Sequence, residues 1–79
     1  MSTREIARTI DARGMACPGP LMSLIGAIRE GAVGDVIEVL SSDEGSKTDI
    51  PAWIKKASHE LVEVVEEDGF ACFVVRKAR

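Results

Sequence analysis

Cys17-Pro18-Gly19-Pro20 lies where a helix is expected to begin, and it is the motif of this chain with the clearest chemical meaning. The first four N–H groups of an α-helix have no acceptor within the helix, so proline is tolerated at its first positions. With Cys17 as the N-cap, Pro18 and Pro20 occupy the first and third helical positions. The amides that remain to face the sulfur are those of Gly19 and Leu21. Such amides and the helix dipole stabilise a thiolate, lowering the pKa of a cysteine from about 8.5 to roughly 3.5 to 7.5. The motif predicts a nucleophilic Cys17.

A second interpretation makes Cys17 a small buried residue after a turn, because free cysteine is among the most buried residue types. That interpretation gives no reason for two prolines at the spacing of a helix start, so the nucleophile is favoured. Cys72 lies in the middle of the apolar segment 70–74 and is expected to belong to the core. His59 has no second ligand at metal spacing, and no metal site is predicted.

The strands and helices that must position the motif can be predicted from the residues on either side of it. Alternating residues favour a strand over residues 5–11, and an apolar stripe predicts a helix over 18–30 that ends at Gly31. The members of that stripe are Leu21, Leu24, Ile25 and Ile28. A β-branched run predicts a strand over 36–40, and segments 60–66 and 70–77 predict a hairpin around a turn at 67–69.

A second helix is expected from residue 46 to about residue 58. Ser46 and Asp49 have the spacing of a capping box, and apolar residues follow at helical spacing. Pro51 conflicts with a start at Ser46, so either the first turn is irregular or the cap is Thr48 or Asp49. The resulting order, βαβαββ, predicts a two-layer α+β sandwich with a four-stranded mixed sheet and both helices on one face. Residues 1–79 are expected to form one domain.

Composition excludes several classes of function. The chain has 79 residues, 46% of them hydrophobic and 29% charged, which is typical of a small globular domain. A net charge of −3 disfavours direct binding of nucleic acid, and no apolar run is long enough for a membrane span. The N-terminus has no apolar signal core, so we expect a cytoplasmic protein. Basic residues gather at 55–56 and 76–79, where they form either solvated surface or a docking site for an acidic partner.

Segment 11–21, with its Cys-Pro-x-Pro motif, resembles the TusA/SirA-like sulfur-carrier family, as do Ser46-Lys47-Thr48-Asp49-Ile50-Pro51 and the closing hairpin. The resemblance extends over about residues 8–77. It implies the βαβαββ fold and a single cysteine, Cys17 here, that carries sulfane sulfur as a persulfide. It implies no cofactor.

The resemblance also implies partners. A persulfide donor, such as a cysteine desulfurase or a rhodanese-like protein, would load Cys17, and an acceptor sulfurtransferase would receive the sulfur. Because a small carrier has no deep pocket, recognition is expected to rest on side chains near the thiol. The candidates are Arg13, Met15, Met22, Ser23 and Asp49. The helix-free face of the sheet leaves room for a partner, so a monomer or a weak dimer is expected.

Two other functions stay open at this point. Cys17 could serve a thiol redox sensor or enzyme, or the domain could be a regulatory docking module without chemistry. The pathway also stays open among tRNA thiolation, sulfur oxidation and molybdenum-cofactor supply. Family members of the tRNA pathway often carry an acidic residue between the two prolines, where this chain has Gly19.

Overall fold

Among the described residues, two helices and four strands follow one another in the order that the sequence predicts. The computed structural model describes residues 6–16 and 18–79. The elements are β1 (Arg8–Asp11), α1 (Gly19–Glu30), β2 (Val36–Ser41), α2 (Ser46–Lys56), β3 (Glu60–Glu67) and β4 (Phe70–Arg76). The strands form one sheet in the order β1-β2-β4-β3, with β1 parallel to β2 and the other neighbours antiparallel. The predicted mixed sheet is confirmed, and β1 is an edge strand.

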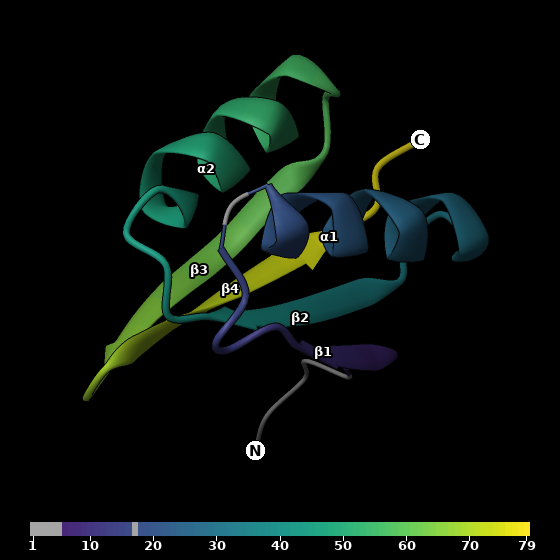
Figure 1. Ribbon diagram of the computed structural model, residues 1–79. Helices are drawn as coiled ribbons and strands as arrows, with labels where there is room; N and C mark the ends of the chain where they lie inside the picture. Colours follow the sequence, from purple (N-terminus) through teal and green to yellow (C-terminus); the bar gives the residue numbers. More distant parts are fainter. Residues whose placement is uncertain (1–5, 17) are drawn as a thin grey trace.

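Both helices lie on the same face of the sheet, as Figure 1 shows, and this prediction is also confirmed. The core lies between the two layers. It is built from apolar side chains of α1, α2, β2 and β4, and includes Leu24, Ile28, Ile37, Val39, Ile50, Ile54, Phe73 and Val75. No helix in the described part of the chain is long and apolar enough to cross a membrane.

Helix α1 begins one residue later than predicted. Pro18 is its N-cap, Gly19 is the first helical residue and Pro20 the second, so the predicted cap position of Cys17 is wrong. The reason is a tight turn before the helix, in which the Gly19 N–H donates to the carbonyl oxygen of Ala16 at 2.8 Å. The buried stripe is also shifted from the prediction, because Pro20 and Ala27 are buried while Leu21 and Ile25 are half-buried. Gly31 ends the helix, as predicted.

Helix α2 begins at Ser46 without the predicted capping box. Its cap is Gly45, without a side-chain cap hydrogen bond, and the N–H groups of Ser46 and Lys47 donate instead to the carbonyl oxygens of Asp43 and Glu44. Ser46 is fully buried, and its hydroxyl is hydrogen-bonded to that of Ser41 at 2.8 Å, so it is not available as a cap. The first turn is tight, since the Thr48 N–H donates to the carbonyl oxygen of Gly45. The irregular first turn is therefore the correct alternative, and Pro51 lies inside the helix.

The closing hairpin runs as predicted. Glu67 pairs with Phe70 across a turn that contains Gly69, whose φ of 90° is readily adopted only by glycine. A bulge between Leu61 and Glu63 shifts the register of β3 against β4. Side chains of β4 alternate between the two faces of the sheet, so Phe73 and Val75 enter the core while Cys72 and Val74 lie on the helix-free face.

Candidate functional site

The site is built around an approach loop, residues 12–16, which connects β1 to the segment that carries Cys17. Cys17 itself lies outside the described residues. Ala12 anchors the start of the loop, because its side chain is completely buried and its N–H donates to the carbonyl oxygen of Leu40 at 2.9 Å. Residues 13–16 are exposed, and so is Pro18 on the other side of Cys17. The chain therefore comes to the surface directly before and after Cys17.

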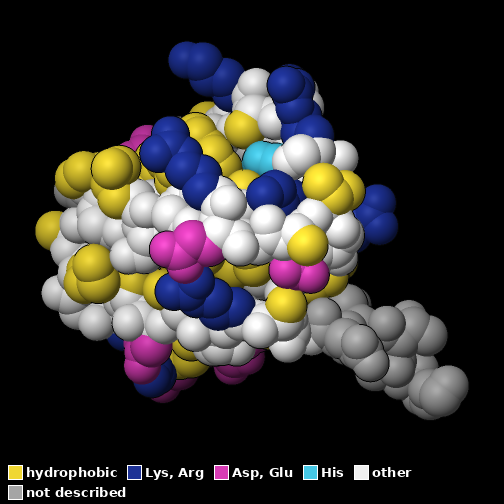
Figure 2. Space-filling view, turned by 90° about the vertical axis from the view of Figure 1, so that its right-hand side faces the viewer, with side chains coloured by type: hydrophobic (Ala, Val, Ile, Leu, Met, Phe, Trp, Pro, Cys, Tyr) yellow, Lys and Arg dark blue, Asp and Glu magenta, His cyan; other side chains and the backbone are white. Residues whose placement is uncertain are grey.

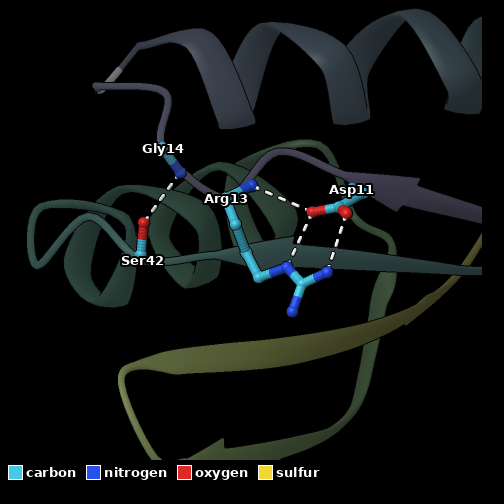
Figure 3. Close-up of polar contacts among 4 residues, drawn as sticks. All are labelled: Asp11, Arg13, Gly14 and Ser42. Carbon is cyan, nitrogen blue, oxygen red and sulfur yellow. Dashed lines mark hydrogen bonds and ion pairs between the residues drawn. The ribbon is translucent and has the colours of Figure 1, made fainter.

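A bidentate ion pair holds the first half of the approach loop (Figure 3). The Arg13 guanidinium donates to both carboxylate oxygens of Asp11, from Nε at 2.9 Å and from Nη2 at 2.8 Å. The Arg13 backbone N–H also donates to Asp11 at 3.2 Å. The hydrogen bond from the Arg13 side chain is the main reason that the pKa of Asp11 is lowered to about 2. The carboxylate therefore keeps its charge at any pH at which the protein would work.

The same guanidinium lies over the ring of Phe70, with 4.9 Å between its central carbon and the ring centroid. Phe70 begins β4, so this contact connects the approach loop to a strand that is distant in the sequence. Arg13 is consequently held on the sheet, away from α1 in Figure 3. The structure does not bring Arg13 together with the predicted partner-surface residues of α1.

A hydrogen bond from outside the loop holds its second half, in addition to the bond from the Met15 N–H to the carbonyl oxygen of Ala12 at 3.2 Å. The Gly14 N–H donates to the hydroxyl oxygen of Ser42 at 2.9 Å, and Ser42 directly follows β2 (Figure 3). Gly14 has a φ of 87°, in the left-handed region that side chains disfavour, so glycine suits this bend. The bond connects the segment before Cys17 to the loop between β2 and α2.

The start of α1 corrects part of the predicted thiolate site. Because the Gly19 N–H donates to Ala16, it is not a free donor for the sulfur. Met15 lies against Gly19, since a Cβ built on Gly19 would come within 2.9 Å of the Met15 terminal methyl group. Met15 and Met22 are 42% and 59% exposed, so two flexible apolar side chains border the start of the helix on its surface.

The other predicted site residues have different surroundings. Pro20 is buried and Leu21 packs against the core, so their side chains support the helix and do not contact solvent freely. Ser23 is half-buried in α1. Asp49 is exposed in the first turn of α2. A role for these residues in thiolate stabilisation or in recognition stays a prediction.

Cys72 is buried, as predicted, but it does not pack among the helix-facing residues of the core. It is 7% exposed on the helix-free face, and its thiol donates to the Glu38 carboxylate at 2.9 Å. Burial raises the pKa of the Cys72 thiol to about 12, with further contributions from the hydrogen bond to Glu38 and from nearby negative charges. Cys72 therefore stays protonated at neutral pH and is a poor nucleophile.

Sequence reasoning missed the groups that hold the approach loop. Asp11 followed by Arg13-Gly14 has the composition of a turn, and that signal could have indicated the bond between Asp11 and the Arg13 backbone. Ser42 and Phe70 gave no such signal, because each is brought to the loop by strand pairing. Only the fold could place them there.

Comparisons with known proteins agree with this geometry. A family model described as sulfurtransferase TusA matches residues 8–77. A protein of Archaeoglobus fulgidus is 56% identical over 70 residues, which cover 89% of this chain and 96% of the relative. The sulfur carrier protein TusA of Pseudomonas aeruginosa is 36% identical over 75 residues, covering 95% of each chain.

The fold is also found among solved structures. The crystal structure of a SirA-like protein from Desulfitobacterium hafniense superposes with a TM-score of 0.80 at 26% identity, covering 91% of this chain and 99% of the other. The match of the family model over nearly the whole chain, the relatives and the shared fold lead to one conclusion: this protein belongs to the TusA family of sulfurtransferases.

Proposed function

We propose that this protein carries sulfur in a relay as a persulfide on Cys17. The observation that carries the proposal is the contrast between the two cysteines of the chain. Cys72 is buried and keeps its proton, whereas Cys17 lies between two exposed residues, Ala16 and Pro18, at the start of α1. Family membership supports the sulfur chemistry, and this contrast supports the Cys17 sulfur as the carrier atom.

Loading is a thiol exchange. The Cys17 thiolate attacks the outer sulfur of a donor persulfide, a new S–S bond forms, and the donor's own S–S bond breaks to release its cysteine as a thiolate. Delivery repeats the step in the other direction: an acceptor thiolate attacks the outer sulfur on Cys17, and the Cys17 thiolate leaves. Each exchange balances without an oxidant, a reductant or a cofactor.

The partners follow from this chemistry. The donor is a protein that forms a persulfide, such as a cysteine desulfurase or a rhodanese-like protein, and the acceptor is another sulfurtransferase. The exposed Met15 and Met22 offer an adaptable apolar contact at the start of α1. We propose that the protein acts in the cytoplasm as a monomer or a weak dimer.

Mass spectrometry tests the carrier atom. After incubation with a persulfide donor, the protein should gain one sulfur, and a reductant should remove it. The Cys17→Ser variant should gain none, whereas the matched Cys72→Ser variant should load like the parent. Loading of Cys17→Ser to the level of the parent would assign the sulfur to Cys72 and refute the proposal. Oxygen adducts without added sulfur would instead indicate a redox sensor.

A further inference from the structure

The C-terminal end of α2, which carries two lysines, is closed by a turn that leads into His59. Ser58 has a φ of 65° and is the one residue other than glycine with positive φ among those described. The Ser58 N–H donates to the carbonyl oxygen of Lys55, and the His59 N–H donates to that of Ile54, which is the pattern of a Schellman motif. This turn directs the chain from the exposed Lys55 and Lys56 into β3 through His59.

The residues after β4 bring two more cations to the same place. Lys77 is tied to the loop after α1, where its backbone bonds to Gly34 and Asp35 and its ammonium donates to the carbonyl oxygen of Gly31 at 2.8 Å. The next N–H, that of Ala78, donates to His59 Nδ1 at 3.1 Å. Because the segment is held at both points, Arg79 follows it to the surface next to His59.

The pKa of His59 indicates that Lys77 and Arg79 lie close to its imidazole. Its pKa is lowered, first by burial and then by the positive charges of Lys77 and Arg79. On its other side the imidazole lies against Trp53 of α2, with 5.6 Å between the ring centroids. We call the group of Lys55, Lys56, Lys77 and Arg79 around His59 the basic end.

The cations of the basic end, like Arg29, take no part in the ion pairs found among the described residues. In the parts of the chain that are described, ion pairs join Arg8 to Glu30, Arg13 to Asp11, Lys47 to Glu44 and Glu66, and Arg76 to Glu60. None of these pairs involves the basic end. Figure 2 shows dark-blue side chains gathered around the cyan histidine on this face, while the magenta carboxylates lie mostly below them.

This concentration of charge is unexpected in a chain whose net charge is −3. Basic residues in the last turn of a helix stabilise its dipole, which accounts for Lys55 and Lys56. The Lys77 ammonium likewise donates to the carbonyl oxygen of Gly31 at the end of α1, whereas no helix end accounts for Arg79, which follows the bond from the Ala78 N–H to His59. The end of α2 and the residues after β4 thus both carry positive charge that no described carboxylate pairs, and a negative ligand would offset the repulsion between these charges.

We infer that the basic end is a docking surface for an acidic segment of a partner protein in the relay. Carboxylates of the partner would pair with the four cations and lie against the His59 ring. The segment would add affinity and orientation to an encounter whose chemistry takes place elsewhere, at the start of α1. Nucleic acid fits less well, since the other charged surfaces of this chain carry an excess of carboxylates that would repel phosphates.

The inference names a contact of the proposed carrier but can be tested without sulfur. His59 and Trp53 are the single histidine and tryptophan of the chain, so the NMR signals of one and the fluorescence of the other report on the basic end directly. We would titrate the full chain with an octaglutamate peptide. Binding should perturb both signals and raise the pKa of His59, because bound carboxylates offset Lys77 and Arg79.

Variants of the basic end test whether its side chains bind the peptide. The Lys55→Gln/Lys56→Gln double variant should bind the peptide about tenfold more weakly, since each exposed pair is worth up to about 1 kcal/mol. Both side chains are exposed, so the fold should be retained. The matched control is Lys47→Gln at the opposite end of α2, which should bind like the parent. Arg79→Gln provides an independent second variant and should also weaken binding.

Three outcomes would overturn the inference. They are no change of the His59 and Trp53 signals with the peptide, an equal loss of binding in the Lys47→Gln control, and a response to a single-stranded RNA oligonucleotide but not to the peptide. None of these results would bear on sulfur loading. Conversely, the Cys17→Ser variant should bind the peptide normally, so failure of the carrier proposal and failure of this inference can be told apart.

Discussion

The approach loop before Cys17 and strand β4 around Cys72 are opposite environments. In the approach loop, residues 13–16 are exposed while their backbone is held by side chains from β1 and from the loop after β2. In β4, residues 71–75 are all buried, and the thiol of Cys72 is hydrogen-bonded to Glu38. The loop combines exposure with a fixed backbone, which a transferring thiol needs. The strand combines burial with negative neighbours, which suppress a thiolate.

The largest expected difference is in alkylation. With Cys17→Ser as background, Cys72 in the folded protein should react with iodoacetamide about a thousandfold more slowly at neutral pH than in the unfolded chain. Its pKa of about 12, raised from 9.0, lowers the thiolate population by that factor. With Cys72→Ser as background, Cys17 should react at least as fast as a free cysteine. Similar rates for the two thiols in the folded protein would contradict the comparison.

A smaller effect should follow from loosening the approach loop. Ser42→Ala removes the acceptor of the Gly14 N–H, so the rate of sulfur transfer through Cys17 should fall about three- to tenfold, the equivalent of one hydrogen bond. Ser42→Thr keeps the hydroxyl and should restore most of the rate. The protection of Cys72 from alkylation should be the same in both variants, because the sheet is intact. Loss of that protection would mean that Ser42 acts on the fold and not on the loop.

Acidification to about pH 4 should not break the ion pair of Asp11 and Arg13 that holds the first half of the approach loop. A carboxylate whose pKa is lowered by folding stabilises the folded protein at pH values above its pKa in the unfolded chain. This stabilisation is lost as the pH falls through the pKa that the carboxylate has in the folded protein. For Asp11 that value is about 2, so NMR signals of the Arg13 guanidinium should stay unchanged from neutral pH to about pH 4. In Asp11→Asn they should differ from the parent over this whole range. A transition of the parent near the pKa of an ordinary aspartate would refute the pairing.

A last effect concerns Cys72 in alkali. Because folding raises the pKa of the Cys72 thiol, the protonated thiol stabilises the folded protein fully at pH values below its pKa of about 9 in the unfolded chain. This stabilisation is lost as the pH rises toward about 12, its pKa in the folded protein. With Cys17→Ser as background, the difference in unfolding free energy between Cys72 and Cys72→Ala should therefore be constant up to about pH 9 and then decrease. Glu38→Gln should lower the pKa of Cys72 only partly, because burial is the largest cause. Denaturant unfolding and thiolate absorbance measure the two quantities, and a return to an ordinary pKa in Glu38→Gln would make the carboxylate the main cause.

The order of elements and the class of the fold could be predicted from the sequence, because hydrophobic periodicity depends on residues that are neighbours along the chain. The helix stripe of α1, the hairpin at Gly69 and the burial of Cys72 are all local patterns of this kind. The Cys-Pro-x-Pro motif likewise indicated a helix start, although the helix begins one residue later and the Gly19 amide is occupied by Ala16.

What the sequence by itself determined is therefore the identity of the nucleophile candidate and the two-layer architecture that presents it. Tertiary structure alone decided which groups hold the loop before it. Ser42 reaches Gly14, and Phe70 reaches Arg13, only because β2 and β4 lie next to each other in the sheet. The Ala78 N–H likewise reaches His59 because the end of α2 and the residues after β4 are brought together. The physical reason is the same in each case: these contacts join residues that are far apart in the chain, and their free energy depends on packing that local preferences do not encode.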